Sequence, residues 1–282
     1  MKRKTQTFIG ASAANIIIIF FGILMLYPII WLIMASFKEG SAIFSDPSLI
    51  PKTWTIQNYI KGWGGIGIVT FSTFFKNSFT ICVACMILNA AFCSLTAYAF
   101  SRLEFPGRKI WFAIMMITLM LPSHATTIPR YIMFHSFGWI DTFLPLIVPK
   151  LFATDAFFIF LLVQFIRSLP KDLDESARID GCGKLGIYAR IILPLSVPAI
   201  ITTVLFTFLW TWDDFFNQLL YLNSPQMYTI PMGIRQFLDA SGISSWGSMF
   251  AMSVLSLLPS FALFFSLQKY FVQGIATTGM KG

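Results

Sequence analysis

The stretch Phe8–Met34, FIGASAANIIIIFFGILMLYPIIWLIM, contains no charged residue. It exceeds the roughly 20 predominantly apolar residues that a helix needs to cross the hydrocarbon core of a bilayer. Lys2, Arg3 and Lys4 precede it, as basic residues precede the apolar part of a signal peptide. The run is too long for such a part, however, and no small-residue cleavage site follows. The stretch therefore predicts a retained membrane-spanning helix.

The composition of the whole chain also indicates a membrane protein. Of its 282 residues, 56% are hydrophobic and only 11% are charged, which leaves too little polar surface for a soluble protein. Five further runs are uncharged or nearly so: Asn77–Phe100, Ile110–Pro129, Phe143–Ile166, Leu195–Trp212 and Ser248–Gln268. Pro122 predicts a break in the run over 110–129. The fold class that we predict is an all-α integral membrane protein with six transmembrane helices, forming one transmembrane domain over residues 1–282.

The net charge of +8 reflects the placement of basic residues, and we expect no nucleic-acid partner. Lys and Arg collect in the short cytoplasmic segments of membrane proteins. With the N-terminus inside, 13 of the 20 Lys and Arg residues fall on the cytoplasmic side and 7 on the outer side. We therefore expect an N-in, C-in orientation, with outer segments at 37–76 and 213–247, a cytoplasmic loop at 167–194 and a cytoplasmic tail at 271–282. The outer segments are either docking surfaces or plain connectors.

The cytoplasmic loop has the sequence RSLPKDLDESARIDGCGKLGIYARIILPLSVP over Arg167–Pro198. Pro170 is suited to the first position of a helix, and Gly181 and Gly183 offer a stop. Three acidic residues lie in the first turns, where the helix dipole favours negative charge: Asp172, Asp174 and Glu175. A second short helix is predicted over Lys184–Ile192, before Pro194. The loop thus predicts a helical hairpin on the cytoplasmic side.

Small residues give the first helix of this hairpin a slim side. Ser176, Ala177 and Gly181 would allow a partner surface to come close, while Glu175 and Arg178 would set the register. One hypothesis is a plug for a groove in a separate cytoplasmic protein, and the other is an amphipathic hairpin that lies on the membrane. An acidic residue buried in such a contact needs a paired Arg or Lys, because breaking a buried ion pair costs about 3–5 kcal/mol.

The same loop resembles the EAA motif of bacterial ATP-binding-cassette (ABC) importer permeases. That pattern is Glu-Ala-Ala, three residues, Gly, nine residues and Ile-x-Leu-Pro. Here it reads Glu175-Ser176-Ala177, then Gly181, then Ile191-Ile192-Leu193-Pro194, with Ser176 in place of the middle Ala.

The resemblance extends over nearly the whole chain and is greatest to carbohydrate-importer permeases of the maltose-permease second-subunit type. The matching segments are Tyr27-Pro28, Ser36-Phe37-Lys38, Asn77-Ser78, Ala97-Tyr98-Ala99-Phe100-Ser101-Arg102, Phe105-Pro106-Gly107-Arg108, Ile179-Asp180-Gly181 and Lys281-Gly282. The family usually has Trp-Asn-Asp-Phe at the outer end of the fifth span. This chain has Trp212-Asp213-Asp214-Phe215, so one amide is replaced by an acid.

The resemblance implies the type I permease fold of ABC importers, as a multi-pass half-translocator in the cell (plasma or inner) membrane, in contact with lipid. It also implies a homologous second permease, two ATP-binding-cassette ATPase subunits and an extracytoplasmic sugar-binding protein as partners. The hairpin would be the coupling helix on the ATPase, with contacts from Glu175, Ser176, Ala177, Arg178, Asp180, Gly181, Ile191, Leu193 and Pro194. The tail over 271–282 would reach the ATPase interface.

This chain is expected to hold no cofactor and to be no enzyme, with ATP and Mg²⁺ bound by the partner ATPase. It contains no G-x-x-x-x-G-K-[ST] phosphate-binding motif. A permease for a non-sugar solute is the alternative, because such permeases share the loop motif. An ion-coupled transporter would be expected to show repeated intramembrane charges or two related halves, which are not evident.

The residues around the predicted outer end of the fifth span have the chemistry of a sugar path. Sugars bind to acids and amides through their hydroxyl groups and stack their C–H faces on aromatic rings. If the helix continues past Trp212, then Trp210, Asp213, Asp214 and Asn217 share one face. The alternative is aromatic anchoring at the membrane interface.

Asp155 is predicted to face a cavity or a subunit interface, since an intramembrane acid avoids lipid. Lys150 can extend toward the outer surface. With only His124 and His135, and without ligand spacing, no metal site is expected, and His124 is better suited to helix packing.

Overall fold

The computed structural model describes residues 2–40, 42–65, 67–239 and 245–279, which form helices joined by turns and contain no β-strand. Their contacts divide the chain into two compact units. Unit 1 comprises Met1–Thr70 and Ile234–Leu257, and unit 2 comprises Phe71–Gly233 and Leu258–Gly282. The all-α fold class is confirmed, whereas one domain over residues 1–282 stays a prediction.

Unit 1 contains a long apolar helix and the segment that follows it. Its helices are α1 (Lys2–Ser36), α2 (Ala42–Ser45), α3 (Gln57–Gly64), most of α15 (Ile230–Asp239) and the first part of α16 (Trp246–Gly279). Lys38 is buried and donates from Nζ to the backbone oxygens of Asp46 (2.8 Å) and Ser48 (2.6 Å). Asn58 Nδ2 donates to the carbonyl of Ser36 at the end of α1 (2.8 Å). These bonds pair a free carbonyl group at the end of α1 and the buried ammonium group of Lys38. The first predicted outer segment therefore begins with an ordered structure.

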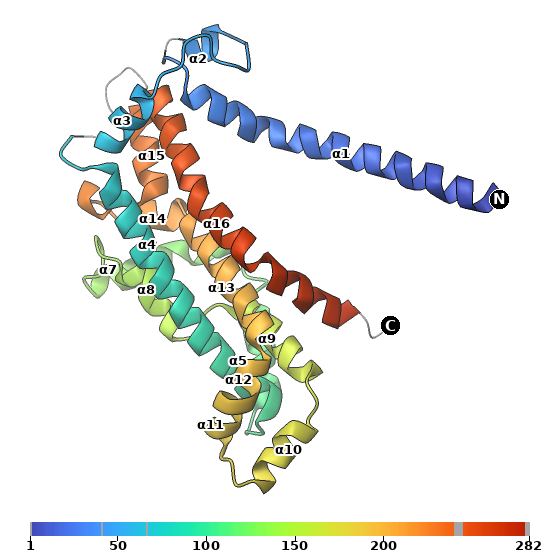
Figure 1. Ribbon diagram of the computed structural model, residues 1–282. Coiled ribbons are helices and arrows are strands. Elements are labelled where there is room, and N and C mark those ends of the chain that lie inside the picture. Colours follow the sequence, from blue (N-terminus) through green and yellow to red (C-terminus); the bar gives the residue numbers. More distant parts are fainter. Residues whose placement is uncertain (1, 41, 66, 240–244, 280–282) are drawn as a thin grey trace. The chain divides into compact units, whose positions relative to one another are not determined.

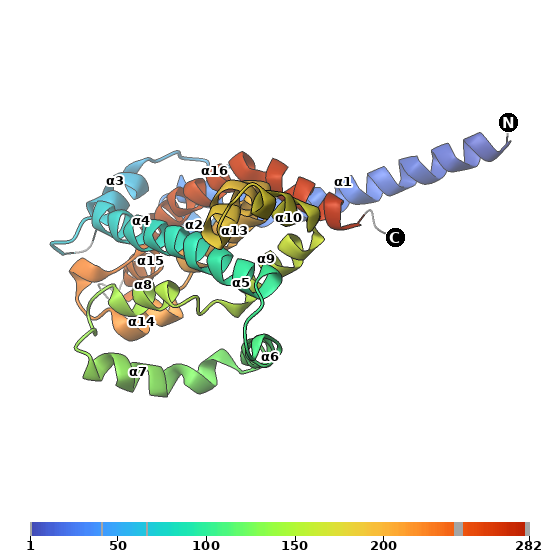
Figure 2. The same ribbon diagram turned by 90° about the horizontal axis from the view of Figure 1, so that it is seen from below.

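Unit 2 contains most of the helices. They are α4 (Phe71–Leu88), the π-helix η1 (Asn89–Cys93), α5 (Ser94–Arg102), α6 (Arg108–Thr118), the 3-10 helix η2 (Ser123–Thr126), α7 (Thr127–Ser136), α8 (Leu144–Leu151), α9 (Ala156–Ser168), α10 (Asp172–Ile179), α11 (Lys184–Ile187), the π-helix η3 (Tyr188–Ile192), α12 (Leu193–Leu195), α13 (Val197–Trp212), α14 (Phe216–Tyr221) and the 3-10 helix η4 (Pro225–Met227). Within it, α4 packs along α13 and α5 packs along α9 (Figure 1). Figure 2 shows α6 and α7 at one edge, with α8 and α9 between them and the pair of α4 and α13.

One apolar core in unit 2 joins the membrane helices to the predicted cytoplasmic loop. Its buried members are Cys93, Ala97, Tyr98, Phe158, Ile159, Leu162, Val163, Ile166, Ala177, Ile187, Ile192 and Ala199. Ala177 comes from α10, while Ile187 and Ile192 come from the second half of the hairpin. Burial of these side chains stabilises the hairpin against α5 and α9, so the loop folds with the helical bundle.

Four described helical stretches are long and apolar enough to cross a membrane: Asn15–Ser36, Phe71–Arg102, Leu144–Ser168 and Trp246–Lys269. A fifth follows if the segments Lys184–Leu195 and Val197–Trp212, which meet at 75°, count as one span. The predicted run over 110–129 is interrupted as expected near Pro122, because α6 ends at Thr118 and η2 begins at Ser123. Six spans and the N-in, C-in orientation stay predictions.

Prolines also shape the entry into the fifth predicted span. The hairpin's second helix was predicted to end at Ile192, but helical structure continues through η3 and α12 to Leu195. A π-turn directly precedes Pro194, which lacks the N–H of a regular α-helix. The bend follows at Ser196, whose backbone N–H donates to the carbonyl of Ile192 (2.9 Å).

Candidate functional site

The α10 hairpin ends its first helix with a regular glycine stop. Gly181 has φ of +81°, a left-handed conformation that glycine adopts without steric penalty. The Gly181 N–H donates to the carbonyl of Arg178 (3.0 Å), and the Cys182 N–H donates to that of Ala177 (2.9 Å). This is the Schellman pattern, which satisfies carbonyl groups that a helix end leaves free. The predicted glycine stop is confirmed, and α10 begins at Asp172, two residues after Pro170.

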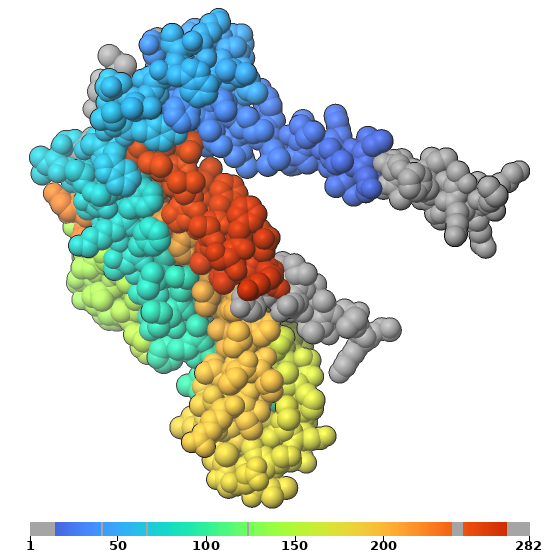
Figure 3. All heavy atoms as spheres, viewed as in Figure 1, coloured from blue at the N-terminus to red at the C-terminus, as the bar shows by residue number. Residues whose placement is uncertain are grey.

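The two sides of α10 have different environments. Asp174 and Ala177 are buried against unit 2, while Glu175, Ser176, Arg178 and Asp180 are exposed. The hairpin projects as a lobe at one end of unit 2 (Figures 1 and 3). Ser176 and Ala177 were expected to share one side that faces a partner, but Ala177 lies in the chain's own core. The outward side is therefore the more charged one.

The remaining loop residues of the predicted contact set lie at several depths. Gly181 and Pro194 are exposed, and Ile191 and Leu193 are partly buried. Ile179 adds an apolar group to the outward surface, since 86% of its surface is exposed. Beside α10 is a cavity of about 480 Å³, whose charged lining includes Arg102, Glu104, Arg108, Lys171, Glu175 and Arg178.

A buried ion pair connects α10 to the ends of two membrane helices. Arg102 Nε lies 3.3 Å from Asp174 Oδ2, and both side chains are less than a tenth exposed. Arg102 Nη2 also donates to the carbonyls of Ile166 (3.0 Å) and Leu169 (2.8 Å) at the end of α9. Asp174 thus has, within this chain, the paired basic residue that a buried acid requires, whereas pairing of an acid buried against a partner stays a prediction. The pair and these bonds therefore connect α10 directly to the ends of α5 and α9.

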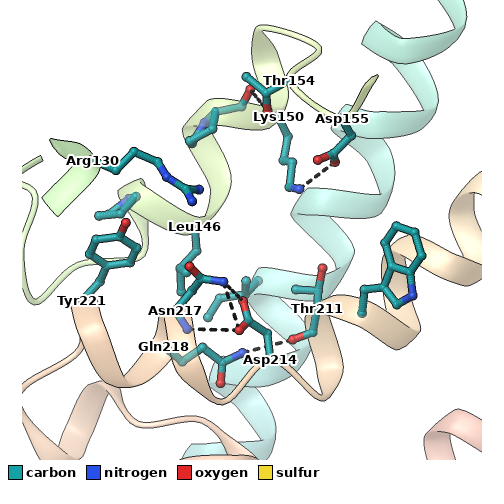
Figure 4. Close-up of a pocket in the computed structure, with 14 residues that line it drawn as sticks. Arg130, Leu146, Lys150, Thr154, Asp155, Thr211, Asp214, Asn217, Gln218 and Tyr221 are labelled. Carbon is teal, nitrogen blue, oxygen red and sulfur yellow. Dashed lines mark hydrogen bonds and ion pairs between the residues drawn. The ribbon is translucent and has the colours of Figure 1, made fainter. Parts of the chain in front are cut away.

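A polar cavity of about 450 Å³ lies elsewhere in unit 2, between α7, α8, α13 and α14 (Figure 4). Of the residues predicted for the substrate path, Trp210, Asp214, Asn217 and Asp155 line it. Asp213 is exposed and is not part of its lining.

The expectation that a single helix carries the path residues is wrong. Helix α13 ends at Trp212 and α14 begins at Phe216, so a break separates Trp210 from Asn217. Asp214 lies in that break, and its Oδ1 accepts the backbone N–H of Asn217 (3.1 Å). Asn217 Nδ2 donates to Asp214 Oδ2 (2.9 Å), as Figure 4 shows. The turn brings these side chains into the cavity, whereas Trp212 is buried against Phe208.

Asp155 lies at a break between α8 and α9, and not in the middle of a continuous helix. Ala153, just before it, has φ of +50°, which is uncommon for a residue with a side chain. Asp155 Oδ2 accepts hydrogen bonds from Lys150 Nζ (2.6 Å) and from Asn89 Nδ2 (2.6 Å). Asn89 also donates to Thr207 Oγ1 on α13 (3.1 Å). Lys150 is thus paired at the cavity wall. Through Asp155 and Asn89, these hydrogen bonds connect the α8–α9 segment, η1 and α13.

Sequence reasoning did not single out Arg130 and Tyr221, which also line the cavity. Arg130 follows Pro129 on α7, directly after the predicted run over 110–129. Tyr221 ends α14, eleven residues after Trp210. No spacing rule connects these positions, because a turn and a separate helix bring them together.

His124 lies with its ring edge-on to Phe216, 5.3 Å between centroids, which is a packing contact. In the part of the chain that the structure describes, no group of three or more His, Cys, Asp or Glu side chains is placed to hold a metal. The candidate sites among the described residues are therefore the hairpin and the cavity.

Comparison with known proteins agrees with the fold. A family model described as "Binding-protein-dependent transport system inner membrane component" matches residues 91–277. The trehalose/maltose transport system permease protein MalG of Thermococcus litoralis is 33% identical over 264 residues, covering 94% of each chain. The arabinooligosaccharides transport system permease protein AraQ of Halalkalibacterium halodurans is 31% identical over 285 residues, covering all of both chains.

A solved structure supports the same architecture. The crystal structure of a bacterial ABC transporter involved in the import of the acidic polysaccharide alginate superposes with a TM-score of 0.81. It covers 93% of this chain and 96% of that chain at 22% identity, so it shows the fold alone. The importer-permease fold and the multi-pass membrane location are confirmed. The chain belongs to the family of inner membrane components of binding-protein-dependent transport systems.

Proposed function

We propose that this chain is the permease subunit of an ATP-driven importer of sugars or oligosaccharides. Membership of a transport-system membrane family makes it a permease component and not an enzyme. The choice of solute is supported by MalG and AraQ, whose names specify trehalose or maltose and arabinooligosaccharides. Both relatives match this chain over nearly its whole length.

The observation that carries the proposed mechanism is the asymmetry of α10. Its inward side is fixed to unit 2 by the Arg102–Asp174 pair and by Ala177 in the core. Its outward side presents Glu175 and Arg178 without burying them. A helix held in this way can receive force on one side and pass it to α5 and α9 on the other. We assign the outward side as the docking surface for an ATPase subunit.

The remaining components follow from this assignment. ATP and Mg²⁺ are bound by two ATPase subunits, because this sequence has no phosphate-binding loop of its own. A homologous second permease completes the path in this proposal. Delivery of the solute by a binding protein is supported by the words "binding-protein-dependent" in the family description. Lipid covers the apolar surface of α1, because successive side chains such as Ile16, Ile17, Ile18 and Ile19 are exposed on all sides of the helix.

Substitution of Glu175 by Lys tests the docking role. A reversed charge at the centre of a polar contact leaves the partner's group unpaired, so we expect solute-stimulated ATP hydrolysis to fall about tenfold or more. The measurement is ATP hydrolysis by the complex purified with the neighbouring subunits, with membrane insertion checked separately.

Asp172→Lys is the matched control. It makes the same charge change in the first turn of α10, outside the Glu-Ser-Ala motif, and likewise replaces an acid near the N-terminus of the helix by a base. The control is expected to hydrolyse ATP near the wild-type rate. Equal rates for wild type and Glu175→Lys would remove Glu175 from the coupling role.

A permease for a non-sugar solute remains the second candidate function, because the loop motif does not specify the solute. ATP-dependent uptake into proteoliposomes distinguishes the two, with uncharged trisaccharides such as maltotriose and arabinotriose, the acidic trigalacturonate and a set of amino acids. Uptake of amino acids without uptake of any trisaccharide would exclude the sugar assignment.

A further inference from the structure

Two hydrogen-bonding atoms at the cavity in unit 2 are buried without a partner in the described structure. They are Nε of Arg130 and the hydroxyl of Tyr221. Tyr221 is only 2% exposed, and Arg130 uses Nη2 for a bond to Thr126 Oγ1 (3.2 Å). Buried polar groups in proteins are nearly always paired, so unpaired groups that line a cavity indicate a ligand that supplies the missing oxygen.

The charges around the cavity balance, but only one pair is in contact. Lys150 and Asp155 are joined at 2.6 Å. Among the described residues, neither Arg130 nor Asp214 has an opposite charge within 4.0 Å. Asp214 is held by Asn217 instead. The lining therefore contains two cations and two anions, and leaves one of each open to a ligand.

Figure 4 shows how these groups are arranged. Arg130 and Tyr221 come from α7 and α14, and Asp214 comes from the break before α14. The Tyr221 ring is fixed by aromatic contacts with Phe134 (5.4 Å) and Tyr131 (6.4 Å between centroids). The Tyr221 hydroxyl is thus oriented before a ligand arrives.

We propose that Arg130, Tyr221 and Asp214 form a subsite that binds hydroxyl groups of an uncharged sugar unit on its way through the permease. The inference rests on the proposed function and specifies its substrate class. Sugar hydroxyls can accept from Arg130 or Tyr221 and donate to Asp214, so one kind of ligand group suits both kinds of partner. The cavity of about 450 Å³ is within the usual range for small-molecule sites, about 300–1,000 Å³.

The charge balance selects against an acidic sugar. A uronate carboxylate beside Arg130 would bring a second negative charge near Asp214 and leave the lining with a net charge of −1. An uncharged sugar leaves the net charge at zero. The permease itself thus contributes to selection, in addition to the binding protein that delivers the solute.

The test measures sugar binding to the permease without the binding protein. The chain is purified with its co-purifying subunits in lipid nanodiscs, and the uncharged trisaccharide that gives the fastest uptake in the panel above is titrated by equilibrium dialysis. Trigalacturonate is the acidic probe. Arg130→Gln is expected to weaken binding of the uncharged probe about tenfold or more, and Tyr221→Phe several-fold. Asp214→Asn is expected to increase binding of trigalacturonate relative to the uncharged probe.

Tyr221→Phe keeps the aromatic contacts and removes only the hydroxyl, so it remains informative if Arg130→Gln does not assemble. Unchanged binding in Tyr221→Phe together with unchanged binding or lost assembly in Arg130→Gln overturns the subsite. Preference of the wild type for trigalacturonate also overturns it. If the wild-type complex transports no trisaccharide at all, the proposed function fails first, and the subsite fails with it.

Discussion

Gly181 shows how a single backbone conformation can determine the shape of the coupling surface. Replacement by Ala puts a Cβ on a residue with φ of +81°, which costs about 1 kcal/mol even though no atom lies within 4 Å of that position. We expect Gly181→Ala to increase protease cleavage of the hairpin and to slow ATP-driven uptake several-fold. Gly183→Ala is the control, because Gly183 has φ of −71° and also has open space around it.

An Asn at position 181 should give an intermediate result, since Asn adopts the left-handed conformation more readily than Ala. Equal protease sensitivity of the Gly181→Ala and Gly183→Ala proteins would show that the left-handed turn does not hold the hairpin in place.

Asp141, in the loop between α7 and α8, carries a prediction about pH. Its carboxylate accepts from the Ser224 hydroxyl and from the backbone N–H groups of Ser224 (2.8 Å) and Asn223 (2.9 Å). The Ser224 bonds lower the pKa of Asp141 below its ordinary value of 3.8, because they stabilise the charged form. The stabilisation is therefore present above pH 3.8 and is lost as the pH falls through the lowered pKa.

Asp141→Asn tests this prediction, because Asn tolerates the positive φ of 61° but cannot ionise. We expect a lower Tm than wild type at neutral pH, with a difference that stays constant down to about pH 5 and shrinks only below 3.8. A difference that disappeared between pH 7 and pH 5 would assign the effect to another group.

At the residue scale, the sequence predicted which kinds of side chain line the cavity better than which residues contact one another. Asp214, Asn217 and Trp210 were expected in a polar path, and they do line the cavity. Arg130 and Tyr221 were missed, because only the turn after α13 and the position of α7 bring them there. Spacing along α10 also did not decide between Asp174 and Glu175 as the buried acid.

The contact of α10 with the ends of α5 and α9 depends on the Arg102–Asp174 ion pair. Asp174→Asn leaves Arg102 without its counter-charge, and loss of one partner of a buried pair costs about 3–5 kcal/mol. We expect a clear drop in Tm and weaker coupling of ATP hydrolysis to uptake. Arg102→Met should be more severe, because it also removes the bonds to Ile166 and Leu169.

The double variant, Arg102→Met with Asp174→Asn, completes a double-mutant cycle and should be less destabilised than the sum of the single changes. The pair of Lys52 and Asp46, in which the Lys52 side chain is 78% exposed, offers a comparison, since Lys52→Met should change stability by less than about 1 kcal/mol. Strict additivity of the two changes at 102 and 174 would show that the pair is not coupled.

Helix positions were predictable where apolar runs are long, and less so at prolines. The run over 77–100 lies within the stretch Phe71–Arg102, and the run over 248–268 lies within α16. The predicted run over 195–212 ends at Trp212, as α13 does. The break between α13 and α14 was missed, because the residues that follow Trp212 keep a helical spacing of polar groups. Local turn formation at Asp214 competed with helix continuation and prevailed.

For the whole molecule, composition was sufficient to predict a membrane protein, and one loop motif was sufficient to indicate its family. Composition and a motif within one loop can both be recognised without knowledge of the three-dimensional structure. The number of spans depends on how breaks near Pro122 and Pro194 are counted, which hydropathy alone does not determine. The division into two units was not predicted, because it depends on contacts between distant segments.

The contact between Lys150 and Asp155 also has a consequence for biosynthesis. Each of these side chains alone would oppose transfer of the segment from the translocon into lipid, because charged side chains are unfavourable in a hydrophobic segment. They lie five residues apart in one hydrophobic segment and meet at 2.6 Å. Each side chain can therefore neutralise the other within the nascent segment, so the segment can enter the bilayer before any later helix has been synthesised.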